Sequence, residues 1–128
     1  MIYLDTSVAL AQLLAEDQYP PEDLWAKTLV SSRLLQYELW NRINARGIAA
    51  SHDESLRALL GRVAFLELSP TVLARALEPF PVPVRTLDAL HLASVTFLLE
   101  RSQDVLLASY DRRMLGAAQG LCIPIYEL

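Results

Sequence analysis

Four acidic residues stand out because their local sequence does not explain them as ordinary surface charges. Asp5 and Asp111 each follow a short apolar run typical of a buried strand. Glu38 and Asp88 lie within strongly apolar patterns of helical spacing. Acidic side chains are rarely buried without a partner. The other acids mostly fall at expected caps, turns and helix ends, so these four are the candidates for chemistry.

A divalent metal ion is the partner that such a group of acids would need. Two carboxylates about 4 Å apart repel by roughly 4 kcal/mol at an effective dielectric constant near 20, so a cluster of four requires protons or cations. Oxygen ligands suit Mg²⁺ or Mn²⁺, whereas a single cysteine, Cys122, and two histidines disfavour zinc. Such ions typically promote phosphodiester hydrolysis by polarising the phosphate and activating water.

Each of the four acids also has an ordinary structural interpretation. Asp5 and Asp111 stand where helix N-caps are expected, and such caps stabilise a helix by about 1 kcal/mol. Asp88 suits the first turn of a helix, where it complements the dipole. Glu38 could pair with Arg42, four residues further along the same helix. The four acids together favour a shared site.

Neighbouring polar residues are candidates for supporting roles. Ser7 is expected at the start of a helix, where it could donate to a carboxylate, a water or a phosphate. Thr6, beside it, is a second candidate. His91 lies three residues after Asp88 and therefore on the same helix face. We expect His91 to be a buried, hydrogen-bonded core histidine and not a metal ligand or general base.

The elements that must position these residues alternate between strands and helices. A chain of 128 residues with 53% hydrophobic side chains predicts one compact domain over residues 1–128. The order predicts an α/β fold with a central, mainly parallel sheet of about four to five strands covered on both faces. Strands are expected near residues 2–4, 29–30, 65–68, 105–108 and 122–126. Helices are expected near 6–14, 32–46, 51–63, 70–76, 87–99 and 111–118.

Charge and hydropathy limit the possible partners. Fifteen acidic against eleven basic residues give a net charge of −4, which argues against broad attraction to nucleic acid or anionic lipid. Ten of the eleven basic residues are arginine, which binds phosphate through paired hydrogen bonds. Candidate phosphate contacts are Arg85, Arg112 and Arg42, with Arg113 and Arg46 also open. No apolar run is long enough for a bilayer, and a lone cysteine favours the reducing cytoplasm.

Four sequence motifs together resemble those of the PIN-domain nucleases, and of the VapC-type toxins in particular. These are Asp5-Thr6-Ser7, Tyr37-Glu38-Leu39, Arg85 to Ala93 and Ser109-Tyr110-Asp111. The resemblance implies a PIN-like three-layer α/β/α fold and a metal-dependent endoribonuclease that uses Mg²⁺ or Mn²⁺. It also implies a homodimeric toxin held inactive by a VapB-like antitoxin.

Carried over by motif, the resemblance assigns catalysis and metal binding to the four acids. Asp5, Glu38, Asp88 and Asp111 match the family's acidic quartet, and Ser109 matches a position usually held by Thr or Ser. A catalytically inactive PIN-like module that binds RNA or protein stays open as an alternative. A haloacid-dehalogenase-like phosphatase is less favoured, because its second Asp is replaced here by Ser7.

Three large apolar side chains have several possible positions. Trp25, Trp40 and Ile43 could lie in the core, at a dimer surface or in a groove for the antitoxin. We expect them in the core.

Overall fold

A four-stranded parallel sheet forms the centre of the protein, as a computed structural model of all 128 residues shows. The strands are β1 (Ile2–Leu4), β2 (Leu29–Ser32), β3 (Val63–Leu66) and β4 (Leu106–Ala108), in the order β3-β2-β1-β4. The predicted α/β fold with a parallel central sheet is therefore confirmed.

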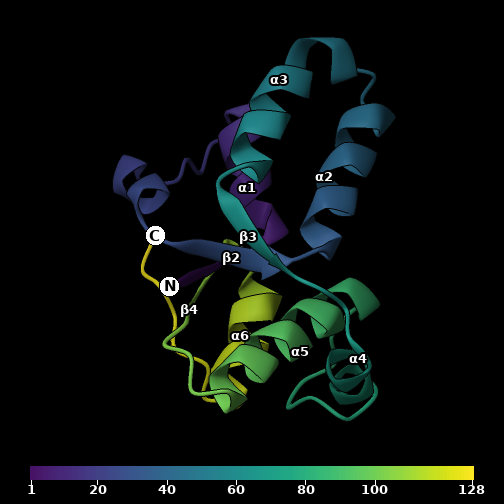
Figure 1. Cartoon of the computed structure of the whole chain (residues 1–128), viewed down its shortest axis with the longest axis vertical. Helices are drawn as coiled ribbons and strands as arrows, with labels where there is room; N and C mark the ends of the chain where they lie inside the picture. The colour runs from purple at the N-terminus through teal and green to yellow at the C-terminus, as the bar shows by residue number, and fades with distance from the viewer.

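Helices cover both faces of this sheet (Figure 1). They are α1 (Thr6–Leu14), α2 (Leu34–Ala45), α3 (Ala49–Leu60), α4 (Pro70–Ala76), α5 (Thr86–Glu100) and α6 (Arg112–Gly120), with a short 3₁₀ helix at Glu22–Ala26. Successive strand residues point to opposite faces, so Leu4 packs in the core under α1, α2 and α3 while Tyr3 packs in the core with α5 and α6. No helix is both long and apolar enough to span a bilayer.

The expected fifth strand near residues 122–126 forms only one bridge to the sheet. Ile125 pairs with Leu107 in the parallel sense. The N–H of Leu107 donates to the Pro124 carbonyl at 2.8 Å, and the N–H of Tyr126 donates back to Leu107 at 2.8 Å. Pro124 has no N–H to continue the ladder, so the segment adds a contact and not a strand.

The expected boundaries around α3 and β3 are wrong by two to three residues. The polar run at Ser51 predicts a helix start there, but α3 begins at Ala49 and Ile48 occupies the cap position. The Ser51 hydroxyl lies inside the helix and donates to the Ile48 carbonyl. Because α3 starts and ends early, β3 also begins before the expected residue Phe65.

The order in which successive strands join the sheet reverses between β1 and β4, although the two strands run parallel. β1 leads into α1 on one face of the sheet, whereas its neighbour β4 leads into α6 on the other face (Figure 1). The N–H of Asp5 donates to the Ala108 carbonyl at 3.0 Å, so the two strand ends lie side by side. Parallel sheets bind their ligands at such a point.

Candidate active site

A pocket of about 440 Å³ lies at the carboxyl ends of β1 and β4 and is lined by all four predicted acids. Asp5 and Asp111 cap α1 and α6, Asp88 lies in the first turn of α5, and Glu38 comes from α2. The N-termini of three helices therefore meet here. Their partial positive charges favour anions and offset part of the repulsion between the carboxylates.

Asp5 is the most tightly held of the four acids. Its side chain is buried, and its Oδ2 accepts hydrogen bonds from the hydroxyls of Ser7 at 2.6 Å and Ser109 at 2.7 Å. The N–H of Tyr110 donates to the Ser7 hydroxyl at 3.0 Å, and the N–H of Asp111 donates to the Ser109 hydroxyl at 2.9 Å. The two serines thus connect Asp5 to the turn that carries Asp111.

Glu38 is held from the opposite side by two other residues. Its Oε1 accepts from the Thr6 hydroxyl at 2.9 Å and from Nε2 of His91 at 2.6 Å. The alternative ion pair between Glu38 and Arg42 does not form. Burial by itself lowers the pKa of His91, but the hydrogen bond to Glu38 and the nearby charge of Asp5 outweigh it and raise the pKa above its ordinary value.

Asp111 and Asp88 differ in how far the protein engages them. Oδ1 of Asp111 accepts from the N–H groups of Arg113 at 2.9 Å and Met114 at 3.2 Å, so it does cap α6. Asp88 is half-buried, and no protein group donates a hydrogen bond to it. Burial, followed by the charges of Asp111 and Asp5, raises the pKa of Asp88 above its ordinary value.

The carboxylates keep oxygens free for a ligand, but they do not form a preassembled cluster. One oxygen each of Asp5, Glu38 and Asp111, and both oxygens of Asp88, accept no hydrogen bond from the protein. No three His, Cys, Asp or Glu side chains lie close enough together to hold one ion. The four carboxylates therefore line one pocket, as a shared site requires, without closing around one point.

The donor set nevertheless suits a hard divalent cation. The free atoms facing the pocket are carboxylate oxygens, which Mg²⁺ and Mn²⁺ prefer. Asp88 has no hydrogen bond to break, so its side chain is free to rotate toward a bound cation. The chemistry of the residues thus fits a metal, although their spacing requires this adjustment.

Several arginines surround the acidic pocket without forming ion pairs. Arg42 and Arg85 line the pocket, while Arg112 and Arg113 join Arg85 around an adjoining hollow. None of the four forms a salt bridge with an acidic residue. Arg46 lines neither hollow. Unpaired guanidinium groups beside the acids can bind phosphate groups, even though the whole chain is acidic.

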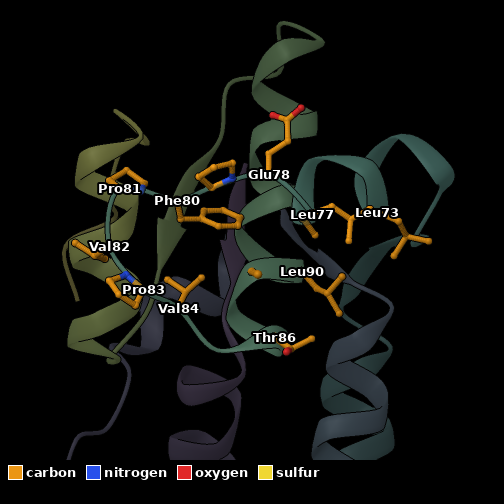
Figure 2. A pocket seen from close by; sticks show the side chains of 13 residues that line it. Leu73, Leu77, Glu78, Phe80, Pro81, Val82, Pro83, Val84, Thr86 and Leu90 are labelled. Carbon is orange, nitrogen blue, oxygen red and sulfur yellow. The ribbon is translucent and has the colours of Figure 1, made fainter.

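The largest hollow in the protein has a different chemical character. It measures about 650 Å³ and lies between α4, the start of α5 and the proline-containing loop 79–83. Figure 2 shows Leu73, Leu77 and Leu90 on one side of it and Phe80 within the loop that forms the other. Its only titratable lining group is Glu78. The smaller acidic pocket, and not this apolar cleft, therefore has the groups needed for chemistry.

The three large apolar side chains that could have lain in the core or at an interface belong to the core, as expected. Ile43 is fully buried, and Trp25 and Trp40 are half-buried and pack against the same core cluster. Exposed apolar side chains lie elsewhere and include one on α4 and one directly after it. Leu77 is 90% exposed, and Leu73 is 42% exposed.

His91 is the buried, hydrogen-bonded histidine that the sequence predicts, but its partners were missed. Nδ1 of His91 lies 2.8 Å from the hydroxyl of Tyr3, and Nε2 contacts Glu38. One signal was present in the sequence. Tyr3 lies two residues before Asp5, and His91 lies three residues after Asp88 on the same face of α5, so each is close in sequence to a predicted acid.

Comparison with known proteins agrees with this arrangement. The PIN domain family model matches residues 2–119, and the chain belongs to this family. The chain is also 29% identical over 126 residues to Ribonuclease VapC47 of Mycobacterium tuberculosis, across 93% of this chain and 90% of that protein. The predicted PIN-domain, VapC-type resemblance is confirmed, and the phosphatase alternative has no remaining basis.

Proposed function

We propose that residues 1–128 form a single PIN-like nuclease domain that acts as a metal-dependent endoribonuclease, the toxin of a VapBC-type toxin–antitoxin system. The observation that carries this proposal is the pocket at the carboxyl ends of β1 and β4, which Asp5, Glu38, Asp88 and Asp111 line with unpartnered oxygens. Similarity to a VapC ribonuclease supports RNA as the substrate. Its place of action is the cytoplasm, where RNA is available.

The four acids would hold Mg²⁺ or Mn²⁺ as the cofactor. When bound, such an ion polarises a phosphodiester and lowers the pKa of water, which makes hydrolysis possible at neutral pH. The two serines keep Asp5 fixed, and Thr6 helps to keep Glu38 fixed, so that their free oxygens face the pocket. Preorganised ligands avoid the cost of ordering at the moment of binding.

The remaining polar residues orient the RNA. Arg42 and Arg85 at the pocket and Arg112 at the adjoining hollow would bind phosphates on either side of the cleaved bond. These local positive charges allow a chain with a net charge of −4 to bind a polyanion at one place. Their position beside the acids would align the phosphodiester with the cofactor.

Cleavage of RNA by purified protein, freed of any antitoxin, tests the proposal. Wild-type protein should cut RNA in Mg²⁺ or Mn²⁺ and lose this activity in chelator. Asp88→Asn and Asp111→Asn should reduce cleavage by at least about a hundredfold, because each removes a charge from the site. Asp104→Asn, an exposed acid outside the pocket, is the matched control and should cut normally. Undiminished cleavage by Asp88→Asn would remove the assignment.

A catalytically inactive module is the second candidate, because no three acids are close enough to share an ion as they stand. Calorimetry with Mn²⁺ near neutral pH separates the two functions. Heat of binding that disappears in Asp88→Asn supports the nuclease. No binding by the wild-type chain supports an inactive module that only binds RNA or protein.

A VapB-like antitoxin and a second copy of the chain are the proposed partners. The resemblance to VapC-type toxins implies both, and both would bury apolar surface. Leu73 on α4 and Leu77, directly after α4, are exposed apolar side chains that a partner could cover. Light scattering after size exclusion should show a homodimer, and Leu77→Glu tests whether α4 contributes to it without disturbing the core. A wild-type monomer would contradict the dimer.

A further inference from the structure

The side chains of Tyr3 and His91 form a buried connection between the sheet and the acidic pocket. Tyr3 lies in β1 and is fully buried, and His91 lies in α5 with 1% of its surface exposed. The Tyr3 hydroxyl accepts a hydrogen bond from the N–H of Ser32 at 3.1 Å and lies 2.8 Å from Nδ1 of His91. The two rings meet edge to face, with centroids 5.8 Å apart. The imidazole is therefore fixed at one nitrogen.

The other nitrogen of His91 reaches Glu38. A carboxylate only accepts hydrogen bonds, so Nε2 must carry the proton of the 2.6 Å contact with Oε1 of Glu38, whatever the charge of the ring. Thr6 donates to the same oxygen at 2.9 Å. Both donors engage Oε1, and Oε2 has no protein partner. Glu38 is 19% exposed, so its free oxygen has access to the pocket.

We propose that Tyr3 and His91 are positioning residues, which hold Oε1 of Glu38 so that Oε2 is presented to a divalent cation in the acidic pocket. A glutamate has three rotatable bonds and would lose considerable freedom on binding an ion. The buried imidazole imposes that order in advance, as residues behind metal ligands commonly do. The inference rests on the proposed function, since it assigns Glu38 to metal binding.

The alternative is that His91 only fills the core between β1 and α5. In that case its replacement would reduce stability without a specific effect on the cation. Val95, in the same helix and fully buried, provides the matched control because it packs in the core without contacting an acid. Val95→Ala should lower stability and leave the affinity for Mn²⁺ unchanged.

Mn²⁺ affinity, measured by calorimetry or by the paramagnetic resonance of free Mn²⁺, is the readout. His91→Leu removes the donor to Glu38 and should weaken Mn²⁺ binding by about 10–100-fold. His91→Gln places an amide donor near the same position and should recover much of the loss. Tyr3→Phe keeps the imidazole but removes its anchor, so its loss should be intermediate. Circular dichroism verifies that each variant is folded.

A double-mutant cycle shows whether His91 acts through Glu38. Glu38→Gln should weaken Mn²⁺ binding, and adding His91→Leu to it should then cause little further loss. The positioning role would be overturned if folded His91→Leu bound Mn²⁺ as tightly as wild type. It would also be overturned if the losses of Mn²⁺ affinity in the cycle were additive, or if Val95→Ala lost as much Mn²⁺ affinity as His91→Leu. Those results leave the nuclease proposal standing. A wild-type chain that does not bind Mn²⁺ would overturn both proposals.

Discussion

Replacing Asp88 by asparagine separates the effect of charge from the effect of hydrogen bonding in this site. Asp88 accepts no hydrogen bond from the protein, so the nearly isosteric Asp88→Asn change breaks none. Its pKa is raised by burial and by the charges of Asp111 and Asp5, which means that the folded protein disfavours the ionised form. Without metal, the variant should therefore be more stable than wild type at neutral pH.

Two effects set the size of this gain: the desolvation of the half-buried Asp88 carboxylate, which is the larger cause of its raised pKa, and the repulsion between the carboxylates. Two unit charges about 4 Å apart repel by about 1 kcal/mol in water and by about 4 kcal/mol at an effective dielectric constant near 20. Asp88 is half-buried in a solvent-accessible pocket, and the acids are not close enough to share an ion, so screening favours the lower value. We expect about 1 kcal/mol, or an increase in Tm of about 3–5 °C.

Metal should reverse the order of the two proteins. Mn²⁺ at about one hundred times its Kd would stabilise the folded wild type by about 2.7 kcal/mol. The variant lacks one of the ligands, so it should gain much less. Wild type should then have the higher Tm, although it has the lower Tm in chelator.

Thermal unfolding followed by circular dichroism, in EDTA and in excess MnCl₂, measures both effects. Asp104→Asn removes the same charge from an exposed position outside the pocket and should change Tm little in either buffer. The reasoning is refuted if Asp88→Asn is less stable than wild type in EDTA. It is also refuted if Mn²⁺ stabilises the variant as much as wild type.

Three further predictions concern pH, packing and RNA binding. The pKa of Asp88 is raised in the folded state, so the metal-free wild type loses stability as pH rises through that pKa. Its lower free energy of unfolding relative to Asp88→Asn should therefore disappear below the ordinary pKa of 3.8. Urea titrations across pH measure this difference. A Cβ at Gly120 would lie 2.6 Å from Cβ of Pro81, so Gly120→Ala should lower the free energy of unfolding by about 1–3 kcal/mol. A Cβ at Gly116, in the same helix, would meet open space, so Gly116→Ala should raise the free energy of unfolding by about 0.5–1 kcal/mol in the same assay. Arg85→Ala should raise KM for RNA more than it lowers kcat, and the effect should shrink at high salt; an unchanged KM would exclude a phosphate contact.

Local signals in the sequence were sufficient for most of the elements. Pro70 after a serine cap predicts the start of α4, and α4 does run over Pro70–Ala76. A glycine directly after the expected helix 32–46 is typical of a helix end, and Gly47 has a positive φ of 66° just beyond α2. These features depend on neighbours in the chain, so no tertiary information is needed to find them. The start of α3 was wrong because Ser51 resembles a cap but does not act as one.

In the candidate site, too, some features are local in the sequence and others depend on contacts between distant segments. The sequence by itself determined which acids follow the strands and which interrupt apolar helix patterns, because type and spacing are local properties. Only the tertiary structure decided that Glu38 is held by His91, 53 residues away, and that His91 is anchored by Tyr3, 88 residues away. It also decided that the acids line one pocket without converging on one point. Hydrogen bonds between distant segments and repulsion between like charges depend on distances in space, which residue order does not specify.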